Sequence, residues 1–232
     1  MSRLLRREKV FLLLVSVFLL ALLVANVFAA SKLIRLDLGF HTVVVAVGIL
    51  PYPVTFLVTD LISEVYGRER ADFTVVLGFV VSLGLLLFLE LGKWVPGFDP
   101  VQQEGFAAFF SSNARAVFAS MLAYLVAQFL DVRLFHWWKR KTRGKHLWLR
   151  NNGSTVGSQL VDTVLVTTVL FYGTSPPFMA GATMGLSEIL PIIRDGFIFK
   201  ALVALLDTPL LYLAVWFLRT MGVSATSDRA SG

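Results

Sequence analysis

Two short polar motifs interrupt apolar stretches of this sequence, and their side chains are the first candidates for chemistry. Gln159 and Asp162 lie three residues apart between His146 and Tyr172, so a helix there would carry both on one face. Gln128 and Asp131 repeat this spacing in the preceding apolar stretch. A carboxylate accepts hydrogen bonds, and a carboxamide both donates and accepts them. Such a set suits a small, polar, planar heterocycle, and it would also suit inorganic cations.

Other ionisable residues also fall inside apolar stretches. A carboxylate near the middle of a bilayer costs about 2.5 to 3.5 kcal/mol on insertion scales, so such groups face protein, water or a ligand. In a purely structural alternative, the only lysine of the group pairs with one acid, the other acids cap broken helices, and nothing binds. We favour a shared polar lining for the group, whose members are Asp60, Asp131, Asp162, Lys200 and Asp207.

The amino-acid composition indicates the class of protein in which these residues lie. Of the 232 residues, 56% are hydrophobic and 16% are charged, whereas soluble domains average about 25% charged residues. The mean hydropathy is +0.75, and several apolar runs reach 18 residues or more. We therefore predict an all-α polytopic membrane protein. The chain contains no cysteine, which excludes disulfides and thiolate chemistry.

The apolar runs predict six transmembrane helices in one domain over residues 10–218. A leader over 1–9 precedes them, and a polar tail over 219–232, expected to be disordered, follows. Pro51 and Pro53 fall inside the second run, and because proline breaks a regular helix, we expect that helix to be interrupted there. The predicted spans are Val10–Ala30, His41–Glu64, Ala71–Trp94, Ala114–Trp137, a stretch ending at Tyr172, and Arg194–Leu218, with loops at Pro96–Asn113 and Gly173–Pro191.

The distribution of basic residues predicts the orientation. With six spans, fifteen of the 21 Lys and Arg residues fall on the side that holds both termini, and the positive-inside rule places that side in the cytoplasm. The net charge of +6 therefore reflects orientation and contact with anionic membrane lipids rather than direct nucleic acid binding.

Enzyme and metal signatures are missing from the sequence. The three histidines, His41, His136 and His146, show no ligand spacing. The sequence has no nucleophile elbow and no phosphate-binding glycine loop. We therefore expect neither an enzyme nor a cofactor or metal.

Several motifs in this order resemble the queuosine precursor transporter family, part of the wider group of vitamin uptake transporters. The first motif runs from Gly48 as GILPYP-x-x-Phe56-x-x-x-Asp60-x-x-x-Glu64. The others are Ser120-x-x-x-Tyr124-x-x-x-Gln128-x-x-Asp131, GKHLWLRNNGST from Gly144 followed by Gln159-x-x-Asp162, and Lys200 with Leu206-Asp207-Thr-Pro209. The resemblance covers residues 20–215 approximately.

The resemblance implies a bacterial inner-membrane transporter that imports 7-deazaguanines, such as preQ0 and preQ1, with queuine as a further candidate substrate, for queuosine salvage in transfer RNA. It implies a site that recognises the guanine-like edge with carboxylates and amides. The residues that we expect there are Asp60, Gln128, Asp131, Gln159 and Asp162, supported by Asn26, Lys200 and Asp207, with Phe56 as a surface for stacking.

Two questions stay open at the level of sequence. The transporter is either a facilitator or is coupled to protons through a buried Asp. Alternatively, the chain is the substrate-binding subunit of an energy-coupling vitamin importer, with a stripe of small residues at Ala21, Ala25 and Ala29 that docks a partner or a second copy in a homodimer. An ion channel or membrane enzyme is a remote third alternative.

Overall fold

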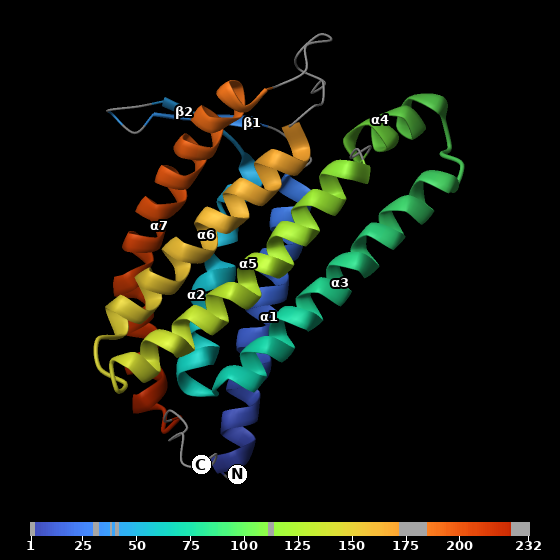
Figure 1. Ribbon diagram of the computed structural model, residues 1–232. Helices are drawn as coiled ribbons and strands as arrows, with labels where there is room; N and C mark the ends of the chain where they lie inside the picture. Colours follow the sequence, from blue (N-terminus) through green and yellow to red (C-terminus); the bar gives the residue numbers. More distant parts are fainter. Residues whose placement is uncertain are drawn as a thin grey trace.

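The computed structural model describes residues 3–29, 33–37, 39, 42–110, 114–171 and 185–223. This part of the chain forms a helical bundle with one short hairpin (Figure 1). In chain order the elements are α1 (Arg3–Ala29), β1 (Leu33–Asp37), β2 (Thr42–Ala46), the 3-10 turn η1 (Val47–Ile49), α2 (Tyr52–Val65), α3 (Arg68–Trp94), α4 (Pro100–Phe110), α5 (Ala114–Lys141), α6 (Leu147–Phe171) and α7 (Leu186–Thr220).

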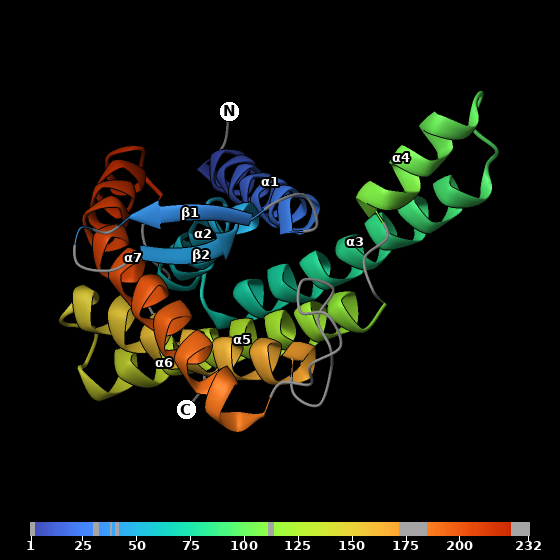
Figure 2. The same cartoon turned by 90° about the horizontal axis from the view of Figure 1, so that it is seen from above.

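Helix α2 is the central element of the bundle. It packs against α1, α3, α5 and α7, and ten of its fourteen residues are buried. The most extensive helix contact is between α5 and α6, which run side by side, and α7 covers α6 and α2 (Figure 1). The hairpin of β1 and β2 crosses one end of the bundle between α1 and α7 (Figure 2). The polar side chains of the candidate site therefore converge around α2.

The exterior of the bundle is apolar. Many large hydrophobic side chains point outward, including Phe88, which is 74% exposed, and Leu206, which is 73% exposed. Among the described residues, four helices are long and apolar enough to cross a membrane, namely Arg6–Phe28, Val47–Val65, Arg68–Trp94 and Leu186–Thr220. A surface of this kind is stable only in lipid, so the chain is a multi-pass α-helical membrane protein.

The second predicted helix differs from expectation in its first part. Residues 42–46 form strand β2, which pairs antiparallel with β1 from Leu33↔Ala46 to Asp37↔Thr42. The run of valines at 43–45 favours a strand because β-branched side chains pack well on a pleated surface. Helix α2 begins only after Pro51, with Pro53 in its first turn, where a missing N–H costs no hydrogen bond. The two prolines therefore start a helix and do not interrupt one.

The predicted loop at Pro96–Asn113 was also wrong, because it contains helix α4. Asp99 caps this helix, since its Oδ1 accepts hydrogen bonds from Val101 N (2.8 Å) and Gln102 N (3.1 Å), and Pro100 follows in the first turn. Helix α4 lies beside the end of α3, away from the rest of the bundle (Figure 2). It takes no part in the candidate site.

Helix α7 begins at Leu186, which is earlier than predicted, and both Pro191 and Pro209 lie within it. At its start, the Glu188 carboxylate accepts a hydrogen bond from Gly185 N (2.7 Å) and caps the helix. The expected connector around Pro176-Pro177 and the expected disorder of the tail after Val223 fall outside the described residues.

The turn between α2 and α3 contains only Tyr66 and Gly67. Gly67 has φ = 89°, a left-handed conformation that glycine adopts at little cost. The Tyr66 hydroxyl donates a hydrogen bond to Arg7 O (2.9 Å), which fixes α1 to this turn. Burial raises the pKa of Tyr66 to about 12, so the hydroxyl keeps its proton and remains a donor at neutral pH.

Candidate functional site

A continuous polar face runs along α6. Its buried polar residues recur every three or four positions and so share one side of the helix, and they are Arg150, Asn151, Ser154, Thr155, Ser158, Gln159, Asp162, Thr163 and Thr167. In a membrane protein such a face is stable only when neighbouring helices or a ligand supply its hydrogen bonds.

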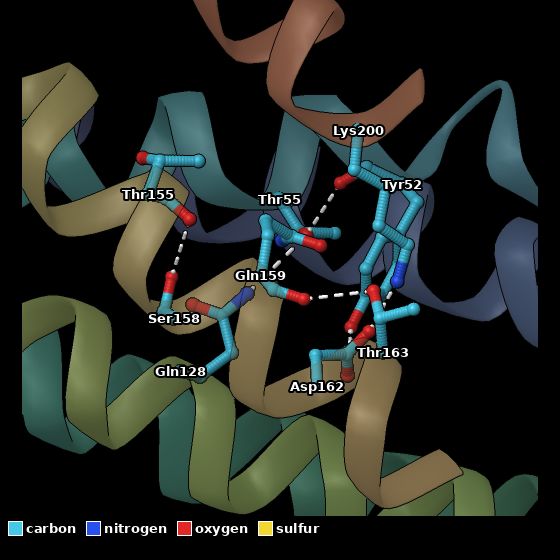
Figure 3. A network of polar contacts seen from close by, with 9 residues as sticks. All are labelled: Tyr52, Thr55, Gln128, Thr155, Ser158, Gln159, Asp162, Thr163 and Lys200. Carbon is cyan, nitrogen blue, oxygen red and sulfur yellow. Dashed lines mark hydrogen bonds and ion pairs between the residues drawn. The ribbon is translucent and has the colours of Figure 1, made fainter. Parts of the chain in front are cut away.

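Asp162 is the acidic residue of this face, and two side chains from neighbouring helices bind it. Lys200 of α7 donates to its Oδ2, and the Tyr52 hydroxyl of α2 donates to its Oδ1 at 3.1 Å (Figure 3). The Lys200 ammonium also lies 5.3 Å from the centre of the Tyr52 ring, within cation–π range. The two charges are buried, with side chains 15% and 6% exposed. Lys200, Asp162 and Tyr52 therefore connect α7, α6 and α2 at one point.

A pocket opens beside this triad, between α2, α6 and α7. Its empty volume is about 310 Å³, counted together with its opening. The side chains with aromatic or polar groups that line it include Tyr52, Phe56, Gln159, Phe199, Lys200 and Asp207. The Tyr52 and Phe56 rings meet edge to face with centres 5.4 Å apart. The pocket thus combines aromatic walls with a few polar groups, as small-molecule sites do.

Gln159 has one hydrogen-bond acceptor that no described residue uses. Its side-chain Oε1 is buried and has no hydrogen-bond partner among the described residues. The residue is 3% exposed and lines the pocket (Figure 3). A buried acceptor without a donor costs about 1 to 3 kcal/mol. A ligand N–H in the pocket would satisfy it.

Gln128 has a different role from Gln159. Its Nε2 donates to Thr55 Oγ1 at 3.2 Å, and its Oε1 accepts from Thr59 Oγ1 at 3.3 Å. Both threonines belong to α2, so the Gln128 amide fastens α5 to α2 (Figure 3). It does not line the pocket.

Asp60 and Asp131 meet behind the pocket. Neither side chain is exposed to solvent. Thr155 Oγ1 donates to Asp60 Oδ2 at 3.5 Å, and Ser158 Oγ donates to Asp131 Oδ1 at 3.0 Å. Thr155 lines the pocket as well, so one hydroxyl separates this pair of acids from the ligand space.

The structure brings most of the predicted site residues together and places one elsewhere. Asn26 of α1 donates from Nδ2 to Ser82 Oγ of α3 at 3.1 Å, away from the pocket. Phe56, Gln159, Lys200 and Asp207 line the pocket, and Asp162 contacts it through Lys200 and Tyr52. Among the described residues, no group of three or more His, Asp or Glu is placed to hold a metal ion.

The sequence prediction missed several residues of the site. Tyr52 was not predicted as a site residue because the Pro-Tyr-Pro motif around it was interpreted as a helix break, whereas it starts helix α2. Thr55 and Thr59 are four apart on α2, and Ser154 and Ser158 are four apart on α6, so a search for hydroxyls at helical spacing would have found them. Phe199 carried no signal that separates it from the lipid-facing phenylalanines.

A bundle with an apolar exterior and polar side chains around an internal pocket is the architecture of a membrane transporter. Comparison with known protein families identifies the family of transporters. Residues 46–214 match the model of the family described as "Putative vitamin uptake transporter". The chain belongs to this family, which is a family of transporters and not of enzymes.

Three relatives are named as queuosine precursor transporters. The protein of Bacillus subtilis (strain 168), "Probable queuosine precursor transporter", is 31% identical over 169 residues, which are 72% of this chain and 70% of the relative. The "Queuosine precursor transporter" of Escherichia coli (strain K12) is 28% identical over 175 residues, with the same two shares. The Haemophilus influenzae protein is 30% identical over 148 residues, 62% of this chain and 58% of the relative. No solved structure matches this chain significantly.

Proposed function

We propose that this protein imports queuosine precursors, 7-deazaguanines of the preQ0 and preQ1 type, with queuine as a larger member of the series. The single observation that carries this proposal is the pocket in which Gln159, whose Oε1 has no hydrogen-bond partner among the described residues, lies with aromatic rings, Lys200 and Asp207. The relatives' names support the same substrate class. Transport then requires no cofactor.

The chemistry of the pocket fits a guanine-like base. Such a base presents adjacent N–H donors on one edge, and carboxylates and amide oxygens accept hydrogen bonds of that kind. Gln159 Oε1 and the half-buried Asp207 offer these acceptors. Lys200 offers a donor for a ring carbonyl or nitrogen, and the Phe56 and Phe199 rings offer faces for stacking.

We further propose that six helices cross the bacterial inner membrane, with both ends of the chain in the cytoplasm. Helices α5 and α6 join the four strongly apolar ones, because at 28 and 25 residues they extend about 42 and about 38 Å, enough to span a bilayer. An even number of spans agrees with Arg6, whose Nη1 donates to Met221 O at 3.2 Å and so connects the two ends. The excess of basic residues at this end supports the orientation.

The alternative of a subunit that docks onto an energy-coupling partner receives little support. The small-residue stripe that was to form the docking face includes Ala21 and Ala25, which are buried within this chain. Helix α1 contacts η1, α2 and α3. The same burial removes the stripe as an argument for a homodimer.

A binding experiment with uptake as its companion tests the proposed function. Purified protein is titrated with preQ0, preQ1, queuine and guanine by calorimetry, and uptake of labelled preQ1 is measured in cells that cannot synthesise it. We expect saturable binding of the deazaguanines and uptake in cells that express the wild type. Replacing Asp162 by Asn releases Lys200 from its partner, so uptake should fall at least tenfold at equal expression.

Two outcomes would contradict the proposal. Wild-type protein that binds none of these bases would remove the substrate class. Co-purification of an ATPase, with uptake that depends on it, would establish the subunit alternative instead.

A further inference from the structure

Asp60 and Asp131 form a pair of carboxyl groups with no cation between them. Asp60 belongs to α2 and Asp131 to α5, and the two acids are electrostatic neighbours beside α6. Thr155 donates to Asp60, and Ser158, whose hydroxyl also lies 3.0 Å from Thr155 O, donates to Asp131. Both residues are 0% exposed. Asp60 Oδ1 and Asp131 Oδ2 are buried, and neither has a donor among the described residues. Two such neighbouring carboxylates cannot both be ionised at low cost, so the pair requires a proton.

The neighbouring charges are already paired with other groups. Lys200 of α7 neutralises Asp162 of α6. Arg150 of α6 faces Asp60, but its Nη2 lies 3.1 Å from Glu64 Oε2 of α2, and Lys139 of α5 lies 3.6 Å from the same oxygen. No ion pair of Asp60 or Asp131 occurs within the described ranges.

The remaining neighbours are neutral donors. Thr155 and Ser158 of α6 each donate to one carboxyl oxygen of the pair, and Ser154 lies beside Asp131. Other titratable groups near the pair are Tyr52 of α2 and Tyr124, Arg133 and His136 of α5. The Tyr124 hydroxyl donates to Val75 O at 3.0 Å, and the Arg133 guanidinium lies 5.7 Å from the centre of the Phe129 ring. The hydroxyls satisfy one oxygen of each carboxyl and leave the second oxygen of each, Asp60 Oδ1 and Asp131 Oδ2, without a donor among the described residues.

We propose that Asp60 and Asp131 hold one shared proton and form a proton-binding site behind the substrate pocket. The site is separate from the Lys200–Asp162 pair, and Thr155 joins it to the pocket because its side chain contacts Asp60 and also lines the ligand space. Releasing the proton leaves two facing negative charges, which repel and drive α2 and α5 apart. The same site is then the coupling site for protons, a role that rests on the proposed transport function.

Infrared spectroscopy of the protein in liposomes tests the proton site without any substrate. We expect a protonated carboxyl band at neutral pH that shifts in heavy water and vanishes at alkaline pH. Asp60→Asn and Asp131→Asn should each abolish it, whereas Asp207→Asn, which alters the half-buried acid at the pocket, should retain it. Asparagine is isosteric with a protonated aspartate, so both variants should fold, and gel filtration checks this.

Three results would overturn the site. The first is a wild type that lacks the protonated carboxyl band at neutral pH, which excludes a shared proton whatever the variants show. The band could disappear in Asp207→Asn alone. Replacing choline chloride by sodium chloride at constant pH could remove the band, which would show a sodium site in its place.

Transport assays test the coupling. In liposomes that contain the protein, an inward proton gradient should raise the initial uptake rate of labelled preQ1 severalfold for the wild type and not for Asp131→Asn. Uptake by the wild type that ignores the gradient would overturn the coupling role. Absence of any wild-type uptake would instead contradict the proposed function, and the infrared band would still decide the proton site.

Discussion

Arg150 and Glu64 form an ion pair inside the protein: Arg150 Nη2 lies 3.1 Å from Glu64 Oε2, and the two side chains are only 2% and 6% exposed. The contact is an ion pair by distance, without the alignment of a good hydrogen bond. Lys139 Nζ lies 3.6 Å from the same oxygen, and Arg219 Nη2 lies 4.0 Å from Glu64 Oε1. One carboxylate of α2 thus attracts cations of α5, α6 and α7.

Replacing Glu64 by Gln should destabilise the protein strongly. The substitution leaves the buried Arg150 guanidinium without a counter-charge, and breaking one partner of a buried pair costs about 3 to 5 kcal/mol. The free energy of unfolding in detergent, measured by denaturant titration, checks this. Asp72→Asn is the matched control, because it breaks the exposed Arg68–Asp72 pair and should cost under about 1 kcal/mol. Equal losses in the two variants would contradict a special role for Glu64.

Two glycines of α3 should respond in opposite ways to substitution by alanine. A Cβ at Gly78 would lie 2.6 Å from the Tyr124 hydroxyl and from Phe18 Cε1, so Gly78→Ala must displace α1 or α5 and should cost about 1 to 3 kcal/mol. A Cβ at Gly84 meets no atom within 4 Å. Gly84→Ala should therefore leave stability unchanged or slightly raised. Thermal unfolding in detergent compares the two, and a larger loss at Gly84 would refute the close approach of α1, α3 and α5.

The two glutamines should separate stability from ligand affinity. Gln128→Ala removes both hydrogen bonds to Thr55 and Thr59 and should lower the free energy of unfolding by about 1 to 3 kcal/mol. Gln159→Ala removes an acceptor that no described residue uses, so stability should hold while the Kd for preQ1 rises about tenfold. Calorimetry gives the Kd and denaturation gives the stability. An unchanged Kd in Gln159→Ala would remove this residue from the site.

Much of the polar interior could be predicted from the sequence, because an ionised side chain in an apolar helix has few other places to point. The partners could not be predicted. The sequence is equally compatible with an ion pair of Lys200 with Asp131, Asp162 or Asp207, and only the packing of α7 against α6 selects Asp162. Asn26 shows the limit of the argument, since a polar residue in a span can equally well join two helices away from any ligand.

The sequence predicted apolar spans at α5 and α6, although both helices also carry buried polar side chains. The hairpin of β1 and β2 escaped prediction because a run of valines is as apolar in a strand as in a helix, and periodicity does not distinguish them over five residues. The pair Asp99-Pro100 is a helix-start signal, so the sequence does indicate a helix inside the predicted loop at Pro96–Asn113.

The buried polar side chains of α5 and α6 bear on how the protein is inserted into the membrane. Each helix alone would present amides, carboxylates and hydroxyls to hydrocarbon during synthesis, at a cost that its own leucines and valines barely offset. Side by side, with Ser158 already bonded to Asp131, the two helices hide these groups from lipid. We therefore expect the two helices to enter the bilayer together as a hairpin, with α2 already in place to receive the Gln128 amide.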